Sequence, residues 1–211
     1  MKKLLSIVML SMVAAGAVAQ DRTPLATLYK EFKPSVITLS DGRQLKQGLT
    51  NVFLKNSSLL YMSGEHAMEA NMDQVAAVKF DDRSFVNLNN QLATIVDSVG
   101  QNVLYCVELF DQDSYERNLR NNVNLSNISL GGDQIGTTTV DLNNEEDYML
   151  PVFRHYFMRI NGDIIRVHER ELLRKLNKEQ RTMLKRIIEL PNFSWQNEDN
   201  LKTLLKAITN E

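Results

Sequence analysis

The chain has 211 residues, of which 43% are hydrophobic and 24% charged, and its formal net charge is −2. This balance is typical of a globular protein with a sizeable core and excludes an intrinsically disordered chain. Cys106 is the single cysteine, which excludes an intramolecular disulfide, so stability must come from packing.

Residues 1–19 have the parts of a secretory signal peptide. Lys2 and Lys3 give a positive start, an apolar stretch runs from Leu4 to Val13, and Ala17-Val18-Ala19 has the pattern that signal peptidase cuts after. The apolar stretch is too short to span a bilayer, and no cysteine follows it as a lipid acceptor. Cleavage after Ala19 removes 19 residues, two of them lysines, and leaves 192 residues with a charge of −4. We expect a periplasmic or secreted protein with no membrane insertion after cleavage.

Short β-favouring runs separated by turn residues extend from Pro34 to Phe85. The first two flank Asp41-Gly42, where the register depends on the length of the loop. A two-residue turn would set Leu39 against Gln44, an apolar residue against a polar one. A three-residue loop that ends in a left-handed Gly42 instead opposes Ile37 to Leu45, so we predict the longer loop.

Two further hairpins follow in the sequence. The runs Leu92–Val96 and Val103–Phe110 flank a turn near Gly100, and Val152–Val167 contains two runs around Asn161-Gly162. That dipeptide tolerates the positive φ angles of a type I′ turn. Between these hairpins, residues 111–139 are rich in Asn, Asp, Gly and Ser, and we expect a long irregular or weakly paired segment there.

Beyond His168 the apolar residues recur at helical spacing. They form three stripes, which are Leu172, Leu173 and Leu176; Met183, Leu184, Ile187 and Ile188; and Leu201, Leu204, Leu205 and Ile208. Asn177 with Gln180 predicts a capping box, and Pro191 ends the middle helix. The predicted fold is therefore α+β. A β-rich body of small antiparallel sheets or an SH3-like barrel covers residues 20–168, with a possible subdomain break near 86–90, and a helical cap covers 169–211.

The Asn161-Gly162 turn predicts that paired positions sum to 323, which places His155 opposite His168. Two imidazoles within cross-strand reach are the start of a metal site or of a pH-responsive pair. A zinc site needs more ligands, and His66 is distant in sequence. The alternative is a polar strand face, with Met158 and Ile165 turned to the core. We predict no metal and no cofactor.

Charge is segregated along the chain. Residues 154–186 carry ten basic residues against four acidic ones, and residues 108–147 carry nine acidic against two basic. A clustered basic field can attract an anionic partner, so a candidate interaction surface comprises Arg159, Arg166, Arg170, Arg174, Arg181 and Lys185. The alternative is that the two segments neutralise one another or are solvated. The negative overall charge and the lack of a recognition motif argue against nucleic acid.

No other motif predicts catalysis. The run around Cys106 is apolar, which predicts a buried, unreactive thiol. Asp111, Asp113 and Glu116 lack the glycine and distal glutamate of a calcium loop. The glycine-rich residues 131–136 lack the lysine of a phosphate loop, and the adjacent acids at 145–147 are unsuited to glycosidase chemistry. Asp97-Ser98-Val99 matches a short O-glycosylation tripeptide of some bacteria.

Four segments of the mature chain share a common pattern with known sequences: Tyr29–Val36, Asp41-Gly42, Asn51–Asn56 and Leu59–Tyr61. Through them the chain resembles exported proteins of unknown function from Bacteroidetes, and the resemblance covers most of the mature chain. It implies an envelope location in a Gram-negative bacterium and transfers no catalytic residue.

Together these features predict a non-enzymatic exported protein that binds another envelope component, either a protein or a polysaccharide. One alternative is a carbohydrate-binding accessory protein, although Trp195 is the sole tryptophan and is placed to pack between helices. The other is a hydrolase with a dispersed site, which two convergent carboxylates, or a Ser or Cys bonded to a His, would favour.

Overall fold

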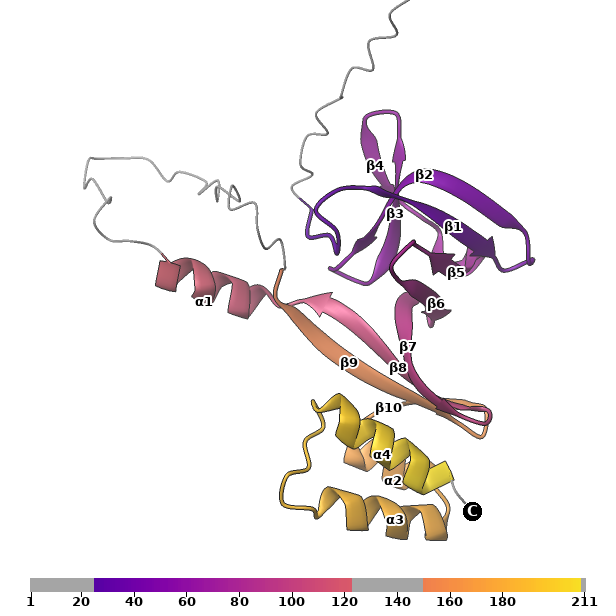
Figure 1. Ribbon diagram of the computed structural model, residues 1–211, viewed down its shortest axis with the longest axis vertical. Coiled ribbons are helices and arrows are strands. Elements are labelled where there is room, and N and C mark those ends of the chain that lie inside the picture. The colour runs from indigo at the N-terminus through magenta and orange to yellow at the C-terminus, as the bar shows by residue number, and fades with distance from the viewer. Residues whose placement is uncertain (1–24, 123–149, 210–211) are drawn as a thin grey trace, which may run out of the picture.

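A computed structural model describes residues 25–122 and 150–209, without the side chains of 118–122. The predicted signal peptide and most of the segment that we expected to be irregular lie outside these residues. The described chain forms ten strands followed by three C-terminal helices, with one helix between the eighth and ninth strands (Figure 1). This confirms the α+β class and the β-rich body with helices at its C-terminal end.

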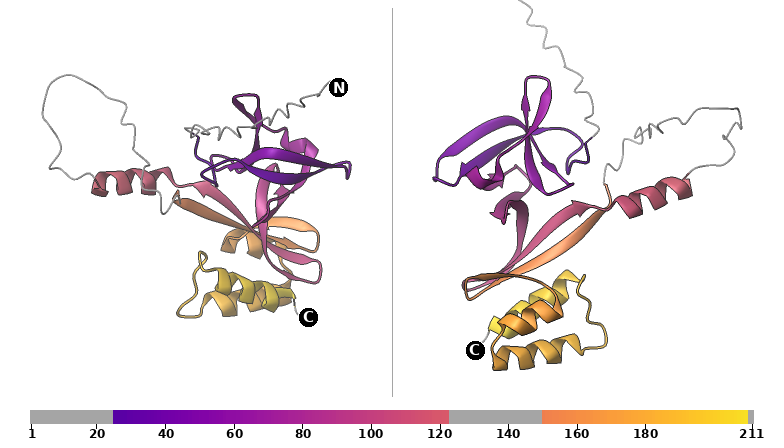
Figure 2. Two further views of the ribbon diagram at one scale, coloured as in Figure 1. Left: turned by 45° about the horizontal axis from the view of Figure 1, so that its top comes forward. Right: turned by 180° about the vertical axis from the view of Figure 1, so that it is seen from behind.

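All ten strands belong to one antiparallel, curled sheet. The strands are β1 (Lys33–Leu39), β2 (Gln44–Phe53), β3 (Ser58–Ser63), β4 (His66–Glu69), β5 (Val75–Lys79), β6 (Ser84–Leu88), β7 (Gln91–Val99), β8 (Asn102–Phe110), β9 (Val152–Ile160) and β10 (Asp163–Arg166). Their order in the sheet is β10-β9-β8-β7-β6-β5-β1-β2-β3-β4. Among the described strands, β1 and β5 are the only pair that is not consecutive in the chain. Their pairing closes strands β1 to β6 into the curled part of the sheet, which we call the half-barrel (Figures 1 and 2).

The hairpin registers agree with the sequence predictions. Ile37 is paired with Leu45, and Gly42 has a φ of 86°, so the three-residue loop is confirmed. In the last hairpin Asp163 is paired with Ile160 and Ile165 with Met158, which confirms pairs that sum to 323. Asn161 and Gly162 both have positive φ. The break predicted near residues 86–90 falls on the end of β6 and the Asn89-Asn90 turn, where the ladder continues into β7.

Residues Gln112–Asn122 form helix α1, where we had predicted irregular chain. The prediction was wrong there because the segment is almost entirely polar and has no apolar stripe to indicate a helix. Its start is nevertheless capped, since the Ser114 backbone N–H donates to the Asp111 carboxylate at 2.9 Å. The Phe110 ring packs on Tyr115 at 5.3 Å and holds the first turn against the end of β8.

The helical cap consists of α2 (Glu169–Lys175), α3 (Lys178–Ile188) and α4 (Glu198–Thr209). The three predicted apolar stripes lie on these helices, except that Leu176 follows α2 as its C-cap, and the capping box of Asn177 with Gln180 is present. Helix α4 packs on β7 and β8, and its buried leucines meet Leu104 and Met158 of the sheet. The cap therefore covers one face of the strands from β7 to β10 (Figure 2).

The core is divided between the two halves of the sheet. One cluster lies inside the half-barrel and includes Val52, Leu59, Val78 and Phe80. A second fills the space between the sheet and the helical cap, and a smaller third lies on the other face of β7 and β8. Among residues 25–122 and 150–209, no helix is both long and apolar enough to cross a membrane.

Candidate functional site

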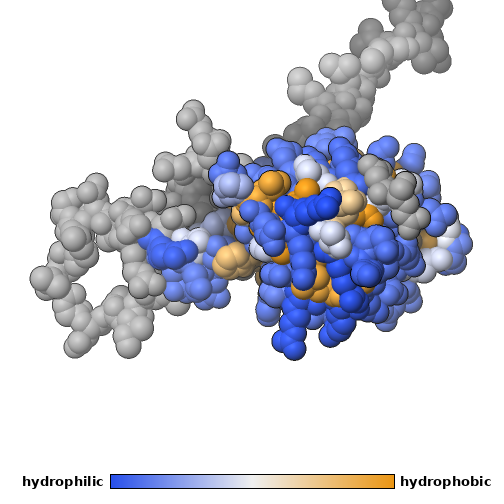
Figure 3. Space-filling view, turned by 90° about the horizontal axis from the view of Figure 1, so that it is seen from below, coloured by the Kyte–Doolittle hydropathy of each residue, from blue (hydrophilic) through white to orange (hydrophobic). Residues whose placement is uncertain are grey.

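The structure divides the predicted interaction surface into two groups. Arg159 and Arg166 lie on β9 and β10, on the face turned away from the helical cap. The other four, Arg170, Arg174, Arg181 and Lys185, lie on α2 and α3, where Arg174 pairs with Glu171. Figure 3 shows that hydrophilic residues dominate the face of the molecule that is seen from below. The basic surface remains a prediction, and it is not one continuous row.

The two predicted histidines have separate roles. His155 lies on β9, where its Nδ1 is 3.2 Å from the Arg166 guanidinium. Strand β10 ends at Arg166, so His168 follows the ladder and caps α2 by accepting the Arg170 backbone N–H at 3.3 Å. Within the described part of the chain, no three metal-ligating side chains gather at one point.

A polar cleft of about 530 Å³ lies between the half-barrel and the start of α4. Glu108 bridges two arginines there, accepting from Arg83 at 2.7 Å and from Arg154 at 3.3 Å. Burial alone would lower the pKa of Arg154, but the hydrogen bond and charge of Glu108 outweigh it and raise that pKa. The three side chains link the β5–β6 turn to β8 and β9.

Cys106 lines the same cleft and is buried, as the sequence predicts. Burial, followed by the charge of Glu108, raises the pKa of its thiol to about 12, so it is not a thiolate near neutral pH. Two further carboxylates line the cleft: Glu198 is held by Lys202 at 2.7 Å, and Asp82 pairs with Lys33 at 3.6 Å. All three carboxylates on the cleft are thus engaged by cations, which suits a structural link better than general acid-base catalysis.

A different opening, which we call the mouth, lies on the inner face of the half-barrel. Strand β2 is paired with β3 only from Thr50 to Phe53, and the β1–β2 and β3–β4 hairpins diverge beyond that point (Figures 1 and 2). The divergence leaves a pocket of about 390 Å³. Its lining is mainly apolar and includes Ile37, Leu39, Leu45, Leu59 and Tyr61. Such a lining is typical of binding sites.

The mouth is bordered by an unpaired strand edge. The Leu39 backbone N–H donates to the Arg43 carbonyl at 2.8 Å, so these residues form a hydrogen-bonded pair. Because hydrogen-bonded and non-hydrogen-bonded pairs alternate in an antiparallel ladder, the backbone groups of Leu45 face β1, while those of Gln44 and Lys46 point away. In residues 25–122 and 150–209, no strand pairs with that side of β2 before Thr50.

Large apolar side chains are exposed around this edge. Leu45 is 48% exposed and Leu49 41% exposed on β2, and Met68 is 46% exposed on β4, opposite Tyr61. Natural proteins usually protect exposed edges with charge, proline or covering chain. This edge carries one charged residue, Lys46, between the exposed Leu45 and Leu49, and it lies beside an open pocket, which makes it a candidate docking feature.

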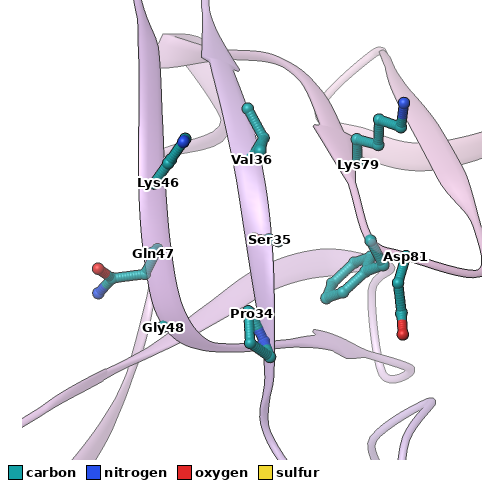
Figure 4. A pocket seen from close by; sticks show the side chains of 9 residues that line it. Pro34, Ser35, Val36, Lys46, Gln47, Gly48, Lys79 and Asp81 are labelled. Carbon is teal, nitrogen blue, oxygen red and sulfur yellow. The ribbon is translucent and has the colours of Figure 1, made fainter.

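The opposite face of the same strands carries a shallow groove of about 460 Å³, shown in Figure 4. Val36 of β1 lies at its centre and is paired with Lys46 on one side and Lys79 on the other. Pro34 adds to the apolar floor, and Asp81 lies at its end. Strand β2 thus separates an apolar opening from a groove with basic rims.

Sequence reasoning did not find the mouth. The available signal was the alternation of Leu45 with polar neighbours on a strand. This alternation predicted that the Leu45 side chain points to the inner face, but not that it is exposed there. Trp195, considered for sugar stacking, is partly buried against the cap core, with Phe193 edge-on at 4.8 Å.

Comparison of the chain with protein families, curated proteins and solved structures finds no match.

Proposed function

We propose that this chain is a non-enzymatic exported binding protein, an adaptor that receives an extended segment of another envelope protein at the mouth. The segment would add a strand to the free edge of β2 and place alternate side chains in the apolar pocket. Strand addition of this kind obtains affinity from main-chain hydrogen bonds and specificity from pockets for alternate side chains.

The observation that supports this proposal is the unpaired half of β2 beside an apolar pocket. The edge supplies outward-facing backbone groups at Gln44 and Lys46, and the pocket supplies Leu45 and Tyr61. The export part of the proposal rests on the leader at residues 1–19 and on the resemblance to exported proteins of Bacteroidetes. The SH3-like barrel predicted from the sequence remains a proposal for the curled half, β1 to β6.

A polysaccharide partner has less support than a protein partner. Sugar binding favours exposed aromatic rings for stacking, and Trp195 packs on Phe193 and the cap. The mouth offers one tyrosine, Tyr61, and the amides of Gln47, Asn71 and Gln74, while the rest of its lining is aliphatic. The apolar lining and the free main-chain edge suit a polypeptide.

The proposal is tested by photo-cross-linking in the producing cells. Benzoylphenylalanine replaces Leu45 at the mouth and, as the control, Phe153, which is 50% exposed on β9. We expect an envelope protein to be cross-linked through one extended segment at position 45 and not at position 153. Lys46→Pro added to the position-45 probe should abolish the product, because proline removes an outward-facing N–H and leaves the bonds to β1 intact. Lys46→Arg, which keeps that N–H, should preserve it.

Thermal unfolding must show that the Lys46→Pro protein is folded. Equal cross-linking by the Lys46→Pro and Lys46→Arg proteins would refute strand addition. If the product is a second copy of the chain, and Lys46→Pro converts a dimer into a monomer in sedimentation, the edge is a self-association surface and the adaptor proposal fails.

A further inference from the structure

Lys46 lies in the part of β2 that is paired with β1 but not with β3. Its backbone groups point to the free edge, while its side chain lies on the groove face shown in Figure 4, next to Val36. Gly48, also on the groove, has no atom within 4 Å of a Cβ built on it. No neighbouring side chain therefore fills the space at that end of the strand.

Lys46 and Lys79 also differ from nearby basic residues in their pairing. Lys33 pairs with Asp82 at 3.6 Å, and Arg43 pairs with Asp41 at 2.6 Å. Neither Lys46 nor Lys79 has an ion pair with an acidic residue in the described part of the chain. Asp81, the acidic residue that lines the groove, lies at its end beside Phe80.

The register of β2 fixes where the side chains of an added strand point. A residue opposite Lys46 shares the groove face, because paired residues on neighbouring strands point to the same side. Residues opposite Leu45 and Gln47 share the inner face, where both line the mouth, and Gln47 also borders the groove. An added strand would therefore present alternate side chains to the groove with Lys46 and to the apolar mouth.

We propose that the segment bound by β2 alternates acidic and apolar residues, with an acidic side chain opposite Lys46 and apolar side chains over the mouth. This inference rests on the proposed function and specifies its ligand class. Lys46 supplies the charge selection. Lys79 lies two strands further on, about 14 Å from an added strand, and at physiological salt the screening length is about 8 Å.

The test measures fluorescence polarisation of short labelled peptides with the full mature chain. Three probes have the same length and valine at alternate positions, with glutamate, glutamine or lysine between. We expect the glutamate peptide to bind about threefold to fivefold more tightly than the glutamine peptide, and the lysine peptide to bind most weakly. Lys46→Ala should remove the difference between glutamate and glutamine peptides. Lys79→Ala should change it little, and Lys55→Ala, in the β2–β3 turn, not at all.

The outcomes separate this inference from the function on which it rests. If all three peptides bind equally and Lys46→Pro abolishes binding, strand addition holds and the charge selection is wrong. If the glutamate preference persists in the Lys46→Ala protein, the selecting cation is another one and the inference fails. If none of the peptides binds to the wild-type chain, both proposals fail together.

Discussion

At the scale of single residues, the best-defined electrostatic contact on the outer face of the last hairpin joins His155 to Arg166. The Arg166 guanidinium donates to His155 Nδ1, which must be unprotonated to accept. Burial, followed by the charge of Arg166, lowers the pKa of His155 below its ordinary value of 6.5. The folded protein therefore favours the neutral imidazole.

This contact predicts a pH dependence of stability. Between pH 6.5 and the lower folded pKa of His155, the unfolded chain binds the proton that the folded chain resists, so the unfolding free energy falls as the pH falls through this window. Urea unfolding at intervals from pH 7.5 to pH 5 should show a smaller loss in His155→Gln than in wild type. Arg166→Gln removes one of the two causes of the lowered His155 pKa, so it should give an intermediate loss of unfolding free energy. An unchanged slope in His155→Gln would contradict the assignment.

At the scale of elements, local turn chemistry was sufficient to predict the hairpins. Gly42 and Asn161-Gly162 fix loop length and therefore register, because each residue of shift would move every side chain to the other face. The C-terminal helices were equally predictable, since their apolar stripes have the helical period and the Asn177 cap marks a start. Helix α1 was missed because a helix without an apolar stripe has no such signal.

The capping box of α3 provides a stability prediction. Asn177→Ala should cost about 1 kcal/mol, because it removes the side chain that accepts the Gln180 N–H. Gln180→Ala should cost about 2 kcal/mol, because the Gln180 side chain also donates to the buried Ile208 carbonyl at 2.9 Å. Chemical denaturation measures both, with the exposed Gln196→Ala as control. Equal losses for all three variants would show that the α3–α4 link is not formed.

There is a physical reason why the mouth could not be predicted from the sequence. The mouth exists because β2 and β3 separate beyond the pair Thr50 and Tyr61 and because β5 returns to pair with β1. Both features depend on contacts between distant parts of the chain, which alternation along one strand does not encode. Leu45 was correctly paired with Ile37, and only the long-range arrangement leaves it exposed.

At the scale of the whole molecule, the described strands form one continuous ladder although the core has two main clusters. Strand β7 contributes Leu92 to the half-barrel cluster and Val96 and Val99 to the cap cluster. The Phe110 N–H at the end of β8 donates to the Leu54 carbonyl, which follows β2, at 2.8 Å. Glu108 of β8 adds a charged link to the β5–β6 turn through Arg83 and to β9 through Arg154. Whether the two predicted subdomains are independent therefore depends on whether they unfold cooperatively.

We expect a single cooperative unfolding transition. Trp195 fluorescence reports on the helical cap, and far-ultraviolet circular dichroism reports on the whole fold, so the two curves should coincide in urea if the halves unfold together. Glu108→Gln should lower both midpoints equally. Two separated midpoints, with the tryptophan signal changing alone, would support independent subdomains instead.

The outermost strands, β4 and β10, have only four residues each and offer little template to another chain. The open half of β2 is a longer template, with Leu45 and Leu49 on it. This makes solubility depend on occupancy, because concentrated protein without a ligand presents the same edge to every other molecule in the solution. A saturating ligand would therefore suppress aggregation as well as raise the melting temperature.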